Sequence, residues 1–570
     1  MRQCAPDFMS FNFIQKSFSK IVSKFSKKRA VQKKTAKTQY AKGKQSEVKS
    51  SPKKKTAAKQ PEAKRPEVRR PATHQAKAPE YKVTEPKAKR AKPSNSEGVS
   101  PQPSSQSRVK SKAKSACLDC APQMPKTAEV NSSNSLYIEL GIDFGTRYTK
   151  VCFHNSITGQ IDVVRFTLDP AEVNQALILS QIGTLKNGEV ITGLTASEWH
   201  HRQPELEHTV DFLKMRLVHL DLPEEGNWLK ENKVAHSSEA IENLSAYFLS
   251  NIIIRSQYWI EQQYPELFRN RIAIWTMNVG VPVSCWEGPA TERFEKTLQM
   301  AWALGYSPKV RSMAPLTLEQ LHRCVGQVRM WMKDNQDYAF DCFARPEIAA
   351  AVSAHIQAER SHEGFYTFFD IGDGTVEGAA FRYYQRQGEH RIDFYTESVE
   401  PLGVGALSEQ LCDELRISTE AVRACLCQQN RSPEHEKIHS SKTKHKFQCL
   451  VASVVFDGCD KHDEMLEYQA VDDRGDRLRI FVGGGGGNLP FYRNAVKSTH
   501  SNFHHSSCDI PEYRLYKVRC PENLNMGNIP KESFSRFSIA YGLSIPYDDF
   551  LRFDFPDESK SGGVVDRLRL

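Results

Sequence analysis

Two distant copies of one strand–turn–strand pattern are the feature that most constrains this chain. Residues 140–153 read LGIDFGTRYTKVCF, and residues 368–381 read FFDIGDGTVEGAAF. In each copy an apolar strand reaches an Asp, turns through Gly to a Thr and returns as a second apolar strand. The aspartates Asp143 and Asp370 lie 227 positions apart (370 − 143), which is too far for a solenoid repeat. The repeat therefore predicts two similar halves that close on one ligand.

The turn residues indicate what that ligand is. Glycines in such turns can adopt positive φ and can expose backbone N–H groups, which bind anions. The threonines add hydroxyl donors, and aspartates suit a hydrated divalent cation such as Mg²⁺. The candidate binding residues are Asp143, Gly145, Thr146 and Arg147 in the first turn and Asp370, Gly372, Asp373, Gly374 and Thr375 in the second. Two such turns facing each other would hold a polyphosphate from both sides.

A third glycine cluster follows another apolar strand. The strand LRIFV at 478–482 runs into five glycines, Gly483 to Gly487, and then into Asn488-Leu-Pro490. Successive glycines between a strand and a helix let the backbone approach a flat group such as adenine or ribose. We expect Gly483, Gly484 and Gly485 to take part in binding. A glycine run alone is often a flexible loop, so the argument depends on the two hairpins.

Charge divides the chain into two unlike parts. Residues 1–135 contain 32 Lys and Arg against 9 Asp and Glu, so residues 136–570 contain 46 (78 − 32) against 59 (68 − 9). The segment 30–135 consists largely of Lys, Ala, Pro, Ser and Gln, and such a composition buries too little apolar surface to order the chain. The sequence thus predicts a disordered basic tail joined to an acidic globule large enough for two lobes.

The first 29 residues have a different pattern from the tail. Phe11, Ile14, Phe18, Ile21, Val22 and Phe25 fall within about a 100° arc of a helical wheel, with lysines opposite. This pattern is typical of a helix on an anionic membrane surface or on a partner protein. The alternatives are docking on the chain's own acidic globule, or no helix at all. Non-specific nucleic acid is a further candidate partner for the basic tail.

The lack of visible targeting signals and of a cysteine pairing framework favours a cytoplasmic protein. The alternative is a protein bound peripherally to the inner face of a membrane. No apolar run approaches the ~20 residues of a membrane span, and no secretory signal is visible. The fourteen cysteines form no pairing framework. The single CxxC, Cys117 to Cys120, lacks a second pair at zinc spacing, so reduced cysteines are the favoured interpretation over a zinc or redox site.

The three motifs, in this order, resemble the actin-like ATPase superfamily, and most closely the nucleotide-binding domain of the heat shock protein 70 (DnaK-type) family. Connecting stretches at 180–196, 210–217, 279–283, 402–406 and 536–543 are also similar. The resemblance implies an α/β, two-lobed fold of duplicated ribonuclease H-like domains. It covers 136–550, with lobe I at 136–352 and lobe II at 353–550, followed by a C-terminal tail at 551–570. The sequence ends before a peptide-binding domain, so we expect no ATP-dependent holding of unfolded substrates.

The resemblance also implies roles for individual residues. Asp143 and Asp370 would position Mg²⁺ through waters, and Lys214 would stabilise the transferred phosphoryl group of ATP and orient the attacking water. Glu377 would help to polarise that water. Four departures from the family pattern are Asp373 and Glu377 in the second hairpin, Arg345 in place of a Glu, and Asn488 in place of an Arg.

Four functions follow as hypotheses. The first is a slow, chaperone-like ATPase that acts as a nucleotide-dependent switch for an unknown protein partner. The second is an actin-like filament protein, which only the Asp373 form of the turn supports. The third is a small-molecule kinase, and the fourth is a nucleotide-sensing scaffold with negligible hydrolysis.

The N-terminal pattern makes a direct prediction. Phe18→Glu with Phe25→Glu removes apolar burial worth about 1–2 kcal/mol per side chain before ordering costs, while every lysine remains. We expect the parent protein to bind liposomes increasingly with anionic lipid, and the double variant to lose this binding. Equal pelleting of both proteins would contradict the amphipathic helix and leave only a polycation.

Overall fold

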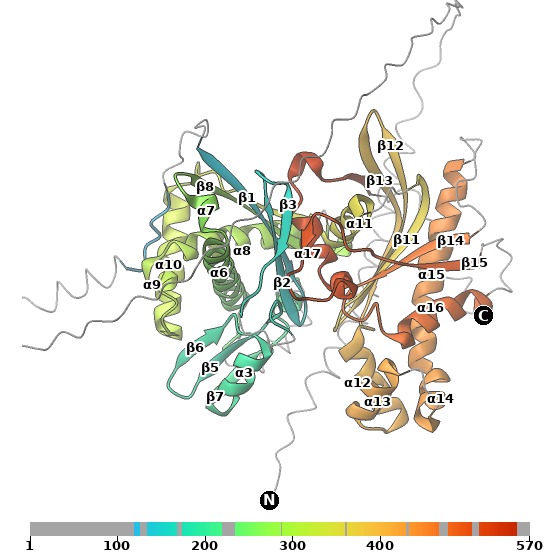
Figure 1. Ribbon diagram of the computed structural model, residues 1–570. Helices are drawn as coiled ribbons and strands as arrows, with labels where there is room; N and C mark the ends of the chain where they lie inside the picture. The colour runs from blue at the N-terminus through green and yellow to red at the C-terminus, as the bar shows by residue number, and fades with distance from the viewer. Residues whose placement is uncertain are drawn as a thin grey trace, which may run out of the picture. The chain divides into compact units, whose positions relative to one another are not determined.

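The computed structural model describes residues 119–125, 134–167, 174–218, 220, 234–286, 288–358, 362–428, 432–466, 477–503 and 512–555. The predicted amphipathic helix, most of the basic tail and residues 556–570 of the predicted C-terminal tail lie outside these ranges. The described chain is α/β with mixed sheets (Figure 1). None of its helices is both long enough and apolar enough to cross a membrane.

The first large sheet is built around the first predicted hairpin. Its strands are β1 (Ser135–Phe144), β2 (Tyr148–Asn155), β3 (Gln160–Val163), β8 (Ile272–Val281), β10 (Cys342–Pro346) and β16 (Leu524–Asn525), in the order β10-β8-β1-β2-β3-β16, and β4 (Ile178–Leu179) pairs with β2. β1 pairs antiparallel with β2 and parallel with β8, and β8 pairs parallel with β10. Apolar side chains alternate or run continuously along β1, as expected for a strand covered on both faces.

The second large sheet repeats this topology around the second hairpin. Its strands are β11 (Gly364–Ile371), β12 (Val376–Arg386), β13 (Glu389–Glu400), β14 (Arg477–Gly483), β15 (Glu512–Lys517) and β17 (Arg552–Asp554), in the order β15-β14-β11-β12-β13-β17. β11 pairs antiparallel with β12 and parallel with β14, and β14 pairs parallel with β15. Both predicted hairpins are therefore present, and the duplication extends to the whole sheet.

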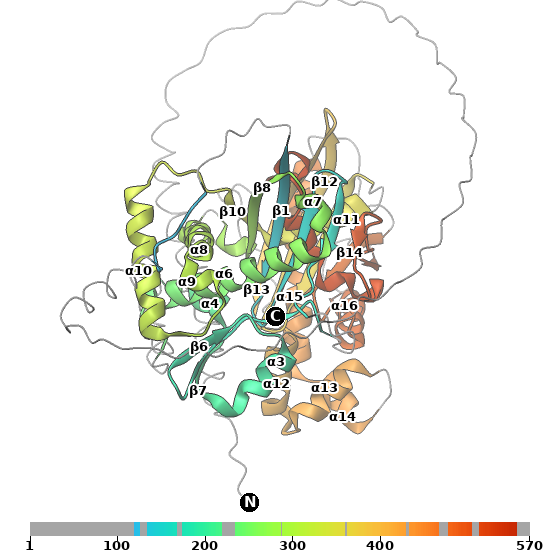
Figure 2. The ribbon, with the colours of Figure 1, turned by 60° about the vertical axis from the view of Figure 1, so that its left-hand side comes forward.

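Helices cover each sheet. In the first half, α6 (Ser238–Gln263), α8 (Pro289–Gly305) and α10 (Leu318–Asp334) lie together near β8 (Figures 1 and 2), with the short α7 (Pro265–Phe268) and α9 (Pro308–Arg311). The helices of the second half are α12 (Val404–Leu415), α13 (Thr419–Cys427), α14 (Pro433–His439), α15 (Lys442–Leu466) and α16 (Pro490–Phe503). A four-stranded sheet of β5 (Ile182–Leu185), β6 (Glu189–Thr192), β7 (Leu206–Val210) and β9 (Leu316–Thr317) accompanies α3 (Ala196–Arg202) and α4 (Leu213–Val218).

Two helices join the halves in one apolar core. Core residues of α11 (Glu347–Ala358) and α17 (Ser538–Leu543) belong to the same cluster as side chains of both large sheets. Glycine permits this packing, because a Cβ on Gly141 would overlap the backbone of Ala540, and one on Gly542 would overlap that of Ala350. The backbones of β1, α17 and α11 consequently approach more closely than any side chain would allow.

The predicted boundary of the disordered tail at residue 135 is too far along the chain. Residues 119–125 pack on the first half, where Cys120 is buried and its Sγ lies 2.9 Å from that of Cys324 in α10. The backbone N–H of Gln123 donates to Tyr306 O at 2.9 Å. Cys120 belongs to the apolar core of the first half. This burial of a small apolar side chain orders the segment, whereas the preceding Lys- and Pro-rich residues have few apolar side chains to bury.

A carboxyl group within the first sheet predicts a pH-dependent stability. Burial raises the pKa of Glu139 in β1 to about 7, and its Oε2 has no hydrogen-bond partner among the described residues. The native state then binds a proton that the unfolded state releases, so stability falls as pH rises from about 4.5 to about 7. Glu139→Gln should flatten this fall and raise the melting temperature at pH above about 7. Melting curves across pH test it.

The matched control for that measurement is Glu319→Gln, because Glu319 is an exposed residue of α10 paired with Arg323. We expect the control to keep the pH profile of the parent. An unchanged profile in Glu139→Gln would mean that the Glu139 carboxyl is ionised in the folded protein at these pH values.

Candidate functional site

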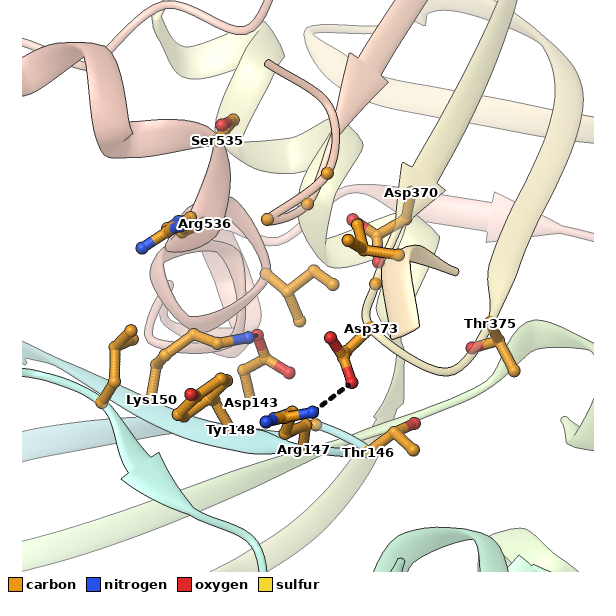
Figure 3. Close-up of a pocket in the computed structure, with 18 of the residues that line it drawn as sticks. Asp143, Thr146, Arg147, Tyr148, Lys150, Asp370, Asp373, Thr375, Ser535 and Arg536 are labelled. Carbon is orange, nitrogen blue, oxygen red and sulfur yellow. Dashed lines mark hydrogen bonds and ion pairs between the residues drawn. The ribbon is translucent and has the colours of Figure 1, made fainter. Parts of the chain in front are cut away.

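A pocket of about 360 Å³ lies where the two hairpin turns and the glycine loop meet. Figure 3 shows the side chains of Asp143, Arg147 and Lys150 on one side and those of Asp370, Asp373 and Thr375 on the other. The predicted residues that line it are Asp143, Gly145, Thr146, Arg147, Lys214, Asp370, Gly372, Asp373, Thr375, Glu377, Gly484 and Gly485. Residues 227 positions apart in the repeat thus face one cavity.

The first turn closes tightly and places Asp143 inside the protein. Asp143 ends β1 and is 3 % exposed, and the N–H of Gly145 donates to its carbonyl at 2.9 Å. Directly across the hairpin, Lys150 of β2 is the register partner of Asp143. The Lys150 Nζ lies 2.5 Å from Asp143 Oδ2, so a short ion pair occupies this carboxylate.

The second turn is held by the start of α12. The backbone N–H groups of Val404 and Gly405 donate to Gly372 O at 3.0 Å and Asp373 O at 2.8 Å. The Asp373 carboxylate reaches across to Arg147 of the first turn, with Oδ2 3.2 Å from Nη1 (Figure 3). A Cβ on Gly374 would lie 2.8 Å from Thr146 Cγ2, so the two turns are in contact. Asp373 therefore joins the two turns. Asp373 was the residue on which the filament hypothesis rested, and these contacts give that hypothesis no further support.

The third loop presents backbone to the pocket. Gly484 has φ 75°, a left-handed conformation that favours glycine, and its N–H donates to Ser535 O at 3.0 Å. Gly486 N–H donates to Ile371 O at 2.9 Å, which fixes the loop against the second turn. A Cβ on Gly485 would meet only Arg536 Nε, at 4.0 Å. Hydrogen bonds thus anchor the loop at Gly484 and Gly486, and Gly485 between them has open space beside its Cα.

A buried ion pair and a buried carboxyl form the floor of the site. Lys214 of α4 and Glu347 of α11 are each 5 % exposed, and Lys214 Nζ lies 2.5 Å from Glu347 Oε1. Burial alone would lower the pKa of Lys214, but the adjacent charge of Glu347 raises it, which keeps the ammonium charged. Glu377 accepts the N–H of Val283 at 2.7 Å, and burial together with Glu347 raises its pKa well above the usual value.

Asp370 remains without a counter-ion in direct contact. Its Oδ1 is buried and has no hydrogen-bond partner among the described residues. Burial, followed by the negative charge of Asp143, raises the pKa of Asp370 to about 7. An unpaired buried oxygen of this kind is costly unless a ligand or water satisfies it. Asp370 is therefore the open polar group of the pocket.

The lining carries equal numbers of acidic and basic side chains. The acids are Asp143, Glu347, Asp370, Asp373 and Glu377, and the bases are Arg147, Lys150, Lys214, Arg423 and Arg536. Five carboxylates against five cations give a formal charge of zero when all are ionised. Three of the cations, Arg147, Lys150 and Lys214, are already paired with carboxylates of the pocket.

The expected Mg²⁺ site at Asp143 and Asp370 does not fit these residues. Mg²⁺ takes oxygen ligands and keeps several waters, yet Oδ2 of Asp143 is bonded to the Lys150 ammonium. Among the described residues no three His, Cys, Asp or Glu side chains are grouped as metal ligands. Asp370 Oδ1 is a buried carboxylate oxygen without a hydrogen-bond partner among the described residues.

Two predicted residues do not line the pocket, and several that line it were not predicted. Gly374 packs on Thr146, and Gly483 packs on the ring of Phe368. The unpredicted lining residues with polar side chains include Tyr148, Lys150, Asn174, Glu347, Arg423, Ser535 and Arg536. Lys150 has a sequence signal: it stands 227 positions before Glu377, at the equivalent place in the repeat.

A scan against protein-family models finds no family that matches this chain. A search of the curated proteins also returns no significant match.

The buried ion pair of Lys214 and Glu347 predicts that removing one charge lowers stability strongly and that removing both charges restores most of it. Lys214→Met leaves Glu347 without its counter-ion, which we expect to lower the free energy of unfolding by about 3–5 kcal/mol. Lys214→Met with Glu347→Met removes both charges and should recover most of that loss. Urea unfolding of the parent, both single variants and the double variant completes the cycle.

Lys296→Met is the matched control, because Lys296 forms an ion pair with Glu292 that is exposed at the surface. Its stability should stay close to that of the parent. A double variant as unstable as Lys214→Met would show that the two side chains act through packing rather than through charge.

Proposed function

We propose that the pocket binds an adenine nucleotide, and that the chain is a two-lobed ATP-binding protein of the actin-like ATPase superfamily, closest to the nucleotide-binding domain of the heat shock protein 70 family. The observation that carries this proposal is the convergence of both hairpin turns and the glycine loop on one pocket. The duplicated strand order supports it, because a protein built from two ribonuclease H-like domains would have the same order in both large sheets.

Each part of the pocket suits one part of the nucleotide. The turns after Asp143 and Asp370 would offer the hydroxyls of Thr146 and Thr375 to phosphate oxygens. Arg147 and Arg423 supply positive charge beside them. The glycine loop, with its open position at Gly485, suits the flat base or ribose. A cavity of about 360 Å³ lies within the range of small-ligand pockets.

The output is a conformational switch with slow hydrolysis at most. Lys214, the proposed catalytic ammonium, is held by Glu347, so its approach to a phosphoryl group requires that this buried pair rearrange. Contacts between the halves would transmit the nucleotide state to a partner: Arg345 Nη1 donates to Ile545 O at 2.8 Å, and Asn278 Nδ2 donates to Leu543 O at 2.9 Å. The basic tail would tether this cytoplasmic switch to an anionic membrane or polyanion.

The proposal is tested by filling the open position in the glycine loop. Gly485→Val should fold normally, because nothing but Arg536 Nε lies within 4 Å of the new Cβ. It should block nucleotide binding, because the added methyl groups project into the proposed base site. Isothermal titration calorimetry with ATP and ADP measures this, with melting temperature as the check on folding.

Gly326→Val is the control, because Gly326 lies in α10, away from the pocket, with nothing within 4 Å of an added Cβ. Its nucleotide affinity should equal that of the parent. Absence of binding heat and of any thermal shift with the parent protein, at every ATP and ADP concentration tried, would refute the proposed function.

A further inference from the structure

We propose that Lys150 replaces the divalent cation in this pocket, so that the protein binds ATP and ADP without magnesium. The inference rests on the proposed nucleotide function and concerns how that site neutralises phosphate charge. It starts from a mismatch: the two aspartates expected to position Mg²⁺ are present, but a lysine ammonium is paired with one of them.

Lys150 is fixed in place by the hairpin that carries it. It lies on β2 directly opposite Asp143, and its side chain is 17 % exposed against 4 % for that of Asp143. A Cβ on Gly145 would lie 3.5 Å from Lys150 Nζ, which places the ammonium against the first phosphate turn. A positive charge therefore stands where the phosphate groups of a bound nucleotide would lie.

The charge of Lys150 also reaches the second aspartate. It acts on Asp370 and opposes the effect of Asp143 and of burial on that carboxyl. Lys150 thus bonds Asp143 directly and acts on Asp370 through space, from the opposite half of the repeat. Lys150 lines the same cavity as both aspartates.

The chemistry of an ammonium suits this role. It carries three N–H donors and no acceptor, so after one bond to Asp143 two donors remain for phosphate oxygens. A dication entering beside it would meet like-charge repulsion at short range, which strengthens as water is excluded. Lys150 therefore both supplies the charge that Mg²⁺ would supply and opposes its entry.

The rest of the lining completes the neutralisation. Arg147, Arg423 and Arg536 add three guanidinium groups around the cavity. Arg147 is partly exposed and is held by Asp373, so it is free to exchange this partner for a phosphate. The phosphate charge of a nucleotide would then be neutralised by side-chain cations alone.

The test compares nucleotide affinity with and without magnesium, using the full-length protein. Calorimetric titrations with ATP and with ADP are run in excess EDTA and in excess Mg²⁺. We expect the parent affinities in the two buffers to agree within about threefold, a difference well under 1.4 kcal/mol. An affinity at least about tenfold lower in EDTA would overturn the inference while leaving the proposed function intact.

Variants of Lys150 give the second half of the test. Lys150→Met should weaken binding in EDTA by about tenfold or more, the loss expected for a charge-assisted hydrogen bond, and Mg²⁺ should restore it because Asp143 becomes open. Lys150→Arg keeps the charge and should stay magnesium-independent. Lys296→Met, which removes an exposed ion pair, should behave as the parent.

The outcomes separate the two proposals. Lys150→Met that binds in EDTA as tightly as the parent would overturn the role of Lys150. If Lys150→Met does not fold, the parent titrations and Lys150→Arg still decide the question. A parent protein that binds neither nucleotide in either buffer would overturn the proposed function, and this inference with it.

Discussion

Burial of carboxylates without water is the constraint on which the pocket depends. A carboxylate removed from water needs a counter-ion or donor at short range, or it takes up a proton. The chain uses all of these solutions within one cavity: Asp143 and Glu347 are paired with lysines, Glu377 accepts a backbone N–H, and Asp370 has a raised pKa. The positions of Lys150 and Lys214 follow from that requirement.

This arrangement links stability with function. Both lysines of the pocket bond acids that come from other elements: Lys150 bonds across its hairpin, and Lys214 of α4 bonds α11. α11 also belongs to the core shared by both large sheets. A ligand that draws Lys214 away from Glu347 would therefore act on the helix that joins the halves. In the proposed switch, α11 would therefore link electrostatic exchange in the pocket to the packing of the two halves.

The parts of the site that sequence predicts are those with a local signal. An apolar strand that ends in Asp and turns through Gly to Thr specifies both its conformation and its place at a strand end, so Asp143 and Asp370 could be located from the pattern. Lys150 carried the same kind of signal, since the repeat aligns it with Glu377, but a lysine in a strand is ordinarily an exposed residue. Only the register of β1 with β2 shows that it faces Asp143.

Other residues had no local signal that could place them. Glu347 was not predicted, although it stands two positions after Arg345, which departs from the family pattern. It is the first residue of α11, and its carboxylate accepts a hydrogen bond from Lys214. Ser535 and Arg536 reach the pocket from nearly 400 positions beyond Asp143, through packing that no periodicity encodes. The tail boundary was likewise misjudged, because composition cannot show that Cys120 finds a buried place beside Cys324.

One difference between the duplicated hairpins, Lys150 against Glu377, sets the charge of the site. Across the first hairpin, Asp143 faces an ammonium; across the second, Asp370 faces the carboxyl of Glu377. A symmetric pair of carboxylates on both sides would leave four buried acids and a strong need for a bound dication. Because the first copy has Lys150 at this position, the two hairpins carry three acids and one ammonium. Because of this asymmetry, every carboxylate of the pocket except Asp370 has a partner among the described residues.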